Sequence, residues 1–209
     1  MSDDFARDDD DNRAFYDQRA PVAVHGYQAA DWGSQASQER RFEVLAAGGA
    51  LGAGSVLDVG CGSGDLLHWL RARDWRGAYT GIDISDAMLA RARAAAPDAR
   101  FERASVLELG AQPVERCDWV LASGIFARRV HAPEEFFERA LVAMLRAARR
   151  GVALNCLSSV GRAAEPGEWR CDPRLALSIA RHRAGDSGGR AVLRDDYHPG
   201  DFTLYVYRA

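Results

Sequence analysis

The sequence of 209 residues contains no lysine, and all 27 of its basic residues are arginine. Schiff-base enzymes, including those that use pyridoxal phosphate, and P-loop ATPases need a lysine in their sites. Both classes are therefore excluded. An excess of positive charge is also lacking, because 30 acidic residues give a net charge of -3 at pH 7. We expect no nucleic-acid partner, since binding to a phosphate backbone needs clustered cations.

Long apolar runs and closely spaced cysteines are missing as well. No run of about 18 apolar residues is present, and the first residues are acidic rather than apolar, so we expect no membrane partner and no export. The four cysteines, Cys61, Cys117, Cys156 and Cys171, form no C-x-x-C pair. We therefore expect no metal site, no disulfide framework, and a cytoplasmic protein with reduced thiols.

The length and the hydrophobic content of 47% are sufficient for one sizeable core. Residues 1–14 are predicted to be a disordered acidic head, because six of the first eleven residues are aspartate. Residues 15–209 are predicted to be a single domain. It begins with an N-terminal strap and a helix within residues 15–50, and Ser34 is of the type that caps a helix.

From residue 55 onwards, apolar runs alternate with amphipathic stretches, in the rhythm of strands and helices. Strands are predicted at residues 55–59, 78–82, 100–104, 118–122 and 151–156, with helices at 65–73, 86–95, 133–150 and 173–183. Two further strands, at 190–198 and 202–208, are joined by the turn sequence Pro199-Gly200-Asp201. The pattern predicts an α/β fold with a mostly parallel seven-stranded sheet, an antiparallel last strand and helices on both faces.

The segment VLDVGCGSGDL, residues 56–66, joins a predicted strand to a predicted helix through a turn with glycine at every second position. A dinucleotide-binding turn has the pattern G-x-G-x-x-G, but Asp65 stands at the place of the third glycine, where it would repel a pyrophosphate. Asp83 ends the next strand, and its carboxylate is suited to accept hydrogen bonds from the two hydroxyls of a ribose. Together these residues predict a nucleoside pocket without phosphates, for a ligand that carries positive charge.

In order and spacing, four segments resemble the motifs of the class I S-adenosylmethionine-dependent methyltransferases. The segments are 58–64, with the pattern D-x-G-x-G-x-G, then 81–88, 101–109 and 117–126. The resemblance covers about residues 15–207 and implies a Rossmann-like fold, S-adenosylmethionine as cofactor and methyl transfer as activity. The cofactor-binding residues that it implies are Asp58, Gly60, Gly62, Gly64, Asp83, Ile84, Ser105, Val106 and Ser123.

The same resemblance implies a role for each of these positions. The glycines border the methionine part, Asp83 binds the ribose, Ile84 and Val106 pack on the adenine, and Ser123 lies near the methionine. Ser105 stands where the family often has aspartate, and it accepts more weakly from the adenine amino group. The alternatives are that the glycines only form a turn, that Asp83 only begins a helix, and that Ser105 only caps a turn.

The acceptor is expected outside the carboxyl ends of the strands, under the strap and under residues 157–189. Asn155 and Tyr197, at the ends of the fifth and sixth predicted strands, are the candidate catalytic residues. Either orients the acceptor through a hydrogen bond, and Tyr197 or His198 takes its proton. For Asn155 and Tyr197 the alternative is a hydrogen bond that ties a loop to the sheet.

Ser34, Gln38 and Arg41 fall on one face of the helix in the strap region, where they are expected to line the amino-acid end of the cofactor. Arg41 is suited to bind the methionine carboxylate through two hydrogen bonds. The alternative is that Arg41 is a solvated residue on a surface helix.

The sequence thus predicts methyl transfer from S-adenosylmethionine to a small-molecule acceptor. One alternative is transfer or cyclisation of the aminocarboxypropyl chain, with release of methylthioadenosine. A second is a non-catalytic cofactor-binding partner subunit. A nicotinamide-dependent dehydrogenase is disfavoured by Asp65.

Overall fold

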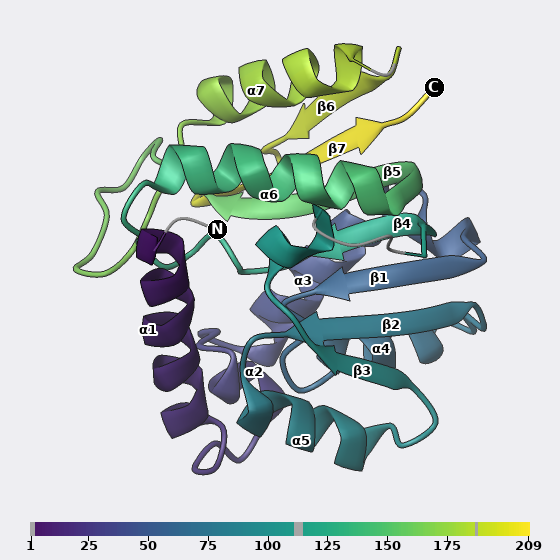
Figure 1. Cartoon of the computed structure of the whole chain (residues 1–209), viewed down its shortest axis with the longest axis vertical. Coiled ribbons are helices and arrows are strands. Elements are labelled where there is room, and N and C mark those ends of the chain that lie inside the picture. Colours follow the sequence, from purple (N-terminus) through teal and green to yellow (C-terminus); the bar gives the residue numbers. More distant parts are fainter. Residues whose placement is uncertain (1–2, 111–114, 187) are drawn as a thin grey trace.

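The computed structural model describes residues 3–110, 115–186 and 188–209. They form one seven-stranded sheet in the order β3-β2-β1-β4-β5-β7-β6 (Figure 1). The strands are β1 (Ser55–Val59), β2 (Ala78–Asp83), β3 (Arg100–Arg103), β4 (Cys117–Ala122), β5 (Ala148–Leu157), β6 (Arg190–Arg194) and β7 (Asp201–Tyr207). β7 is antiparallel to both of its neighbours, and the other adjacent strands are parallel. The predicted Rossmann-like sheet with an antiparallel last strand is confirmed.

Helices cover both faces of the sheet (Figure 1). They are α1 (Asp3–Arg19), α2 (Gly26–Ala29), α3 (Gln35–Ala46), α4 (Asp65–Arg71), α5 (Asp86–Ala95), α6 (Pro133–Ala147) and α7 (Pro173–Gly185), with the 3-10 helices η1 (Ala50–Gly52) and η2 (Val106–Gly110). The observed bounds of β1 and α5 coincide with the predicted ones. The side chain of Ser34 caps α3 by accepting a hydrogen bond of 3.1 Å from the backbone N–H of Ser37, as its residue type predicts.

The core consists of two layers, because side chains alternate between the two faces of a strand. On β4, Val120 and Ala122 pack in one cluster with the apolar residues of α6 and α7. Trp119 and Leu121 point the other way and pack with the residues of α3 and α4. All four are at most 2% exposed, so the sheet is buried on both faces and its ligand-binding edge lies at the strand ends.

The acidic head differs from the prediction, because residues 3–19 form the helix α1 rather than a disordered segment. Phe5 is only 2% exposed, and its ring centroid lies 6.1 Å from that of Phe136 on α6. The carboxylate of Asp8 accepts hydrogen bonds of 3.0 Å from the backbone N–H of His131. Composition alone suggested disorder, whereas one buried aromatic ring and specific contacts of the acids hold the helix in place.

Two further segments also differ from their predicted forms. The strap, residues 15–33, contains the end of α1 and the short α2. β6 ends at Arg194 rather than at residue 198, so Tyr197 lies in the connection to β7 instead of at a strand end. Within the described ranges, no helix has the length and apolar character needed to cross a membrane.

Candidate active site

A cavity opens at the carboxyl ends of β1, β2 and β4, and residues of α1 line one side of it. In Figure 1, α1 lies across these strand ends. Ligands bind at this edge in open parallel sheets. The predicted cofactor residues that line the cavity are Gly60, Gly62, Asp83, Ile84, Ser105, Val106 and Ser123. The structure therefore brings together most of the residues that the motifs implied. Four lining residues that the motifs did not indicate are Asp9, Asn12, Tyr16 and Arg128.

Four of the five backbone amides of the glycine turn, residues 60–64, donate hydrogen bonds within the protein. The N–H groups of residues 60 and 61 donate to the carbonyl oxygen of Ile82, at 2.8 and 3.0 Å. The N–H of Gly62 donates to Oδ2 of Asp83 at 2.8 Å, and that of Gly64 donates to the carbonyl of Cys61 at 2.9 Å. A phosphate-binding turn points such amides at its ligand. Four amides of this turn point into the protein instead, which favours a ligand without phosphates.

Two glycines of the turn serve different purposes. At Gly60, φ is +70°, and an added Cβ would stand 2.2 Å from Cγ2 of Ile125 in the cavity wall. Gly64, with φ of +82°, precedes α4, and an added Cβ would contact the ring of Phe101 at 3.4 Å. Gly64 does not line the cavity. The structure therefore does not place Gly64 in the cavity wall, and its φ of +82°, which other residues rarely adopt, is what favours glycine before α4.

Asp83 ends β2 and is 8% exposed. Its Oδ2 accepts from the N–H of Gly62 at 2.8 Å, and its Oδ1 accepts from the N–H of Ser85 at 2.9 Å. Burial raises the pKa of this carboxyl, while the backbone hydrogen bonds act in the opposite direction. Each carboxylate oxygen accepts more than one hydrogen bond, so both oxygens retain capacity for the hydroxyls of a ribose.

Asp58 lines a smaller cavity that shares Gly60 and Gly62 with the first. It is 2% exposed, and the hydroxyl of Tyr79 donates to its Oδ2 at 2.6 Å. Burial raises the pKa of Asp58 to about 7, and the negative charges of Asp83 and Asp65 add to the effect. A cationic group in this cavity would stabilise the ionised form.

Gln38, which was expected at this end of the ligand, also lines the smaller cavity. Its Nε2 donates to Oδ2 of Asp65 at 3.2 Å. The hydroxyl of Ser63 donates to the same oxygen at 3.1 Å. Two neutral donors, Gln38 and Ser63, therefore hold the carboxylate of Asp65 beside the smaller cavity.

α1 provides a wall that the sequence analysis missed. Asp9, Asn12 and Tyr16 lie three and four residues apart, so one face of the helix presents all three to the cavity. Phe5 continues the same spacing and is buried against α6. This periodicity was the available signal, and the surrounding aspartates obscured it. The Nε of Arg128 donates to Oδ1 of Asn12 at 2.9 Å, which ties the wall to the loop after β4.

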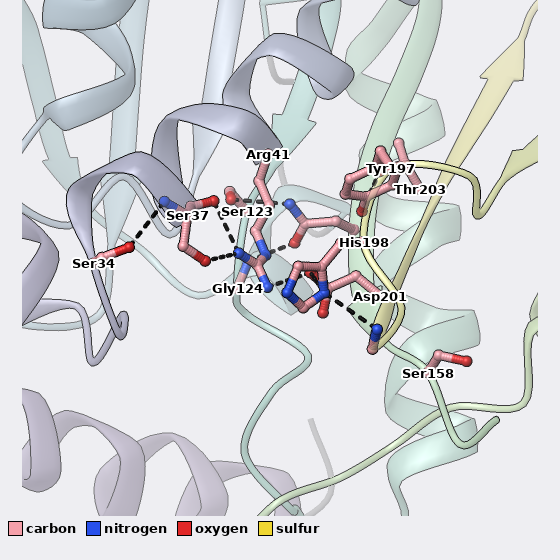
Figure 2. Close-up of polar contacts among 12 residues, drawn as sticks. Ser34, Ser37, Arg41, Ser123, Gly124, Ser158, Tyr197, His198, Asp201 and Thr203 are labelled. Atoms are coloured by element: carbon pink, nitrogen blue, oxygen red, sulfur yellow. Dashed lines mark hydrogen bonds and ion pairs between the residues drawn. The ribbon is translucent and has the colours of Figure 1, made fainter. Parts of the chain in front are cut away.

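Asn155 and Tyr197, the predicted catalytic residues, do not line the cavity. Asn155 is 3% exposed, its Oδ1 accepts from the N–H of Gly124 at 3.1 Å and its Nδ2 donates to Oγ of Ser123 at 3.0 Å. The hydroxyl of Tyr197 accepts from Oγ1 of Thr203 at 2.9 Å (Figure 2). Asn155 thus supports two cavity residues from behind, whereas Tyr197 ties its loop to β7.

Arg41 is neither solvated nor directed into the cavity. It is 6% exposed and forms an ion pair with Asp201 at the start of β7 (Figure 2). Its Nη1 donates to the carbonyl of Ser37 at 2.9 Å, and its guanidinium carbon lies 4.6 Å from the ring centroid of Trp32. His198 has its Nδ1 3.3 Å from Oδ2 of the same aspartate. Arg41 was expected to bind the methionine carboxylate and His198 to take a proton from the acceptor. In the structure both side chains contact Asp201 instead.

Residues 157–189 were predicted to cover the acceptor, but no described residue of this segment lines the cavity. The segment instead supports the loop after β4. The N–H of Arg129 donates to the carbonyl of Gly167 at 2.8 Å, and the N–H of Trp169 donates to the carbonyl of Ala127 at 2.9 Å. The cavity is therefore covered by α1 and Trp32, with residues 157–189 behind the loop that carries Arg128.

Known proteins resemble this chain in sequence. Residues 56–151 match the family model described as a methyltransferase domain. A protein named "Putative methyltransferase" from Mycobacterium tuberculosis (strain ATCC 25618 / H37Rv) is 36% identical over 163 residues, which are 74% of this chain and 93% of that protein. A trans-aconitate 2-methyltransferase of Escherichia coli (strain K12 / DH10B) is 41% identical over 68 residues, which are 32% of this chain and 26% of that protein.

The fold is similar to that of a solved methyltransferase. The magnesium protoporphyrin IX methyltransferase of Synechocystis PCC 6803 with bound S-adenosylmethionine has a TM-score of 0.66 at 18% identity, and 97% of each chain is covered. At this identity the likeness concerns the fold, whereas the mycobacterial relative is similar over most of both sequences. The chain belongs to the class I S-adenosylmethionine-dependent methyltransferases.

Proposed function

We propose that the protein transfers a methyl group from S-adenosylmethionine to a small-molecule acceptor bound under α1. The observation that carries the proposal is a cavity with a buried aspartate at one end, beside a glycine turn in which four of the five amides donate within the protein. This combination suits a nucleoside whose attached chain is cationic rather than phosphorylated. The acceptor is proposed to be small because α1 and Trp32 cover the cavity.

The residues fit the parts of the cofactor in turn. Asp83 accepts hydrogen bonds from the ribose hydroxyls, and the apolar side chains of Ile84, Met88 and Val106 enclose the adenine. Asp58 and Asp65, near the glycine turn, favour the positive charge of the amino-acid end. When bound, S-adenosylmethionine supplies a methyl group that is activated by its sulfonium.

Catalysis is proposed to rest on alignment, because holding two reactants at attack distance removes much of the barrier. The ionisable side chains that line the cavity are those of Asp9, Tyr16, Asp83 and Arg128. Asn155 is proposed as a positioning residue, since it holds Ser123 and Gly124 through hydrogen bonds. Tyr197 has no such link to the cavity wall, and we propose that it stabilises the connection between β6 and β7.

Calorimetry and product analysis of the purified protein test the proposal. S-Adenosylmethionine and S-adenosylhomocysteine are expected to bind, whereas NAD and ATP are not. Turnover with candidate acceptors is expected to release S-adenosylhomocysteine. Protein-dependent release of methylthioadenosine would instead show reaction at the aminocarboxypropyl chain, and binding without any turnover across a broad acceptor panel would favour a non-catalytic partner subunit.

A further inference from the structure

The terminal nitrogens of Arg128 and the hydroxyl of Tyr16 make no hydrogen bond within the described part of the chain and take no part in the proposed cofactor contacts. Arg128 and Tyr16 both line the cavity, from the loop after β4 and from α1. They lie away from the smaller cavity beside Asp58 and Asp65, which neither of them lines. The wall therefore has an acidic end near the glycine turn and a cationic group at Arg128.

Arg128 is held in one orientation but keeps unused hydrogen-bond capacity. Its Nε donates to Asn12, and its guanidinium carbon lies 3.7 Å from the ring centroid of Phe15. Its two terminal nitrogens have no hydrogen bond or ion pair with any described residue of the chain. An oriented guanidinium with two free nitrogens is suited to a planar oxyanion, which it binds through two parallel hydrogen bonds.

Tyr16 adds a neutral donor close to this cation. Its hydroxyl makes no hydrogen bond within the described part of the chain, and its ring meets that of Phe15 edge to face at 5.1 Å. Burial first and the charge of Asp83 second raise the pKa of Tyr16, the charge of Arg128 lowers it, and the pKa is about 12. The hydroxyl is therefore protonated at neutral pH and donates a hydrogen bond, and it lies within electrostatic reach of both charged groups.

We propose that Tyr16 and Arg128 form the acceptor subsite and that they bind a carboxylate of the acceptor molecule. The inference rests on the proposed methyl transfer and names its substrate class. A monoanion fits better than a phosphate ester, because Asp9 and Asp83 line the same cavity and repel a second negative charge. A neutral acceptor without an oxyanion would not use the paired donors of the two terminal nitrogens of Arg128.

The test begins with protein saturated with S-adenosylhomocysteine, whose binding is measured first. The probes are acetate, benzoate and cinnamate, each compared with its own amide by calorimetry or saturation-transfer NMR. At least one acid is expected to bind ten or more times tighter than its amide. If no acid of the panel has this advantage, the inference is wrong, whereas failure to bind S-adenosylhomocysteine would contradict the proposed function itself.

Substitutions at Arg128 and Tyr16 test whether these two residues cause the preference for an acid over its amide. Arg128→Met is expected to reduce acid binding at least tenfold, and Tyr16→Phe about threefold to tenfold. Arg128→Lys keeps the charge but lacks the planar guanidinium, so its affinity for the acids is expected to lie between those of Arg128→Met and the unmodified protein. If Arg128→Met does not fold, Arg128→Lys is used in its place. The matched control is Arg129→Met, because Arg129 is exposed and does not line the cavity. Equal acid binding by the Arg128 and Arg129 variants would overturn the assignment.

A second arm distinguishes an acceptor carboxylate from the carboxylate of the cofactor. Arg128→Met is expected to leave the affinities for S-adenosylhomocysteine and for methylthioadenosine, which lacks the amino-acid end, unchanged within about twofold. A tenfold loss for S-adenosylhomocysteine alone would place Arg128 at the cofactor's carboxylate and overturn the inference.

Discussion

Buried aspartates occur in two regions along the same edge of the sheet, and their surroundings are opposite in charge. Asp58 and Asp83 are 2% and 8% exposed, and other acids, not cations, are the charged groups that most affect their pKa values. Asp201 is 3% exposed, and burial raises its pKa, but it faces Arg41, His198 and Arg170, whose charges act in the opposite direction.

This difference indicates that Asp201 has a structural role, whereas Asp58 and Asp83 are suited to bind a cationic ligand. Burying an ionised carboxylate is unfavourable unless a cation or several hydrogen bonds compensate it. At Asp201 the compensation comes from within the fold. Beside the glycine turn it comes only from neutral donors in the described residues, so a ligand with a sulfonium and an ammonium group would complete the balance there.

The largest effect is expected from removing the cation of the compensated region. Arg41→Met removes the guanidinium that pairs with the buried Asp201 and leaves His198 and Arg170 near it. It is expected to lower the free energy of unfolding by about 3 to 5 kcal/mol. Chemical denaturation measures this change. The control is Arg40→Met, because Arg40 is exposed and its pair with Glu43 lies at the surface.

A double variant tests whether the buried charge of Asp201 causes the loss of stability in Arg41→Met. Adding Asp201→Asn to Arg41→Met removes the uncompensated carboxylate and is expected to restore part of the stability. If Arg41→Met is as stable as Arg40→Met, the contrast between the two regions does not hold.

A pH-dependent effect is expected at Asp58. Because its pKa is about 7 in the folded protein and near its usual value of about 4 in the unfolded chain, the folded protein binds more protons between these values. Stability is therefore lost as the pH rises from about 4 to about 7. Asp58→Asn stays neutral and is expected to gain on the order of 3 kcal/mol relative to the unmodified protein across this window.

Denaturation at several pH values checks this expectation as a difference between the two proteins, so other titrating groups cancel. Asp118→Asn is the control, because Asp118 lies at the opposite end of β4 and away from the cavity. If the difference in free energy of unfolding between Asp58→Asn and the unmodified protein is constant from pH 4 to 7, the pKa of Asp58 is not raised in the folded protein.

The smallest effect concerns ligand affinity at Asp83. Asp83→Ala is expected to weaken binding of S-adenosylhomocysteine by about 1.5 to 3 kcal/mol, the range for hydrogen bonds to a charged group. The control is Asp86→Ala, an exposed acid at the start of α5 that pairs with Arg103. Calorimetry that finds the same affinity for both variants would remove Asp83 from the binding site.

The two regions also differ in how far the sequence predicted which residues the structure brings together. Asp83 and the glycine turn follow two adjacent parallel strands, β2 and β1, of one β–α–β unit, so local spacing determines where they meet. Arg41 and Asp201 are 160 positions apart in the chain, and their contact depends on how α3 packs against β7. Local patterns do not carry such information, and Arg41 was therefore assigned to a ligand instead of to the fold.

The wall formed by α1 was missed for a different reason. The helical spacing of Phe5, Asn12 and Tyr16 was present, but the density of aspartate favoured disorder on composition. Fold class and strand order were accessible because the alternation of strands and helices extends over a hundred residues. A helix that is held by one buried ring and a few hydrogen bonds has a much weaker signature.

The position of Trp32 gives the protein an optical property. Of its five tryptophans, Trp69, Trp75, Trp119 and Trp169 are at most 7% exposed, whereas Trp32 is half-buried and lines both cavities. Its indole lies between the guanidinium of Arg41 and the backbone of Gly124. Emission that a soluble quencher can reach therefore comes chiefly from one ring, and that ring stands where cofactor and acceptor would meet.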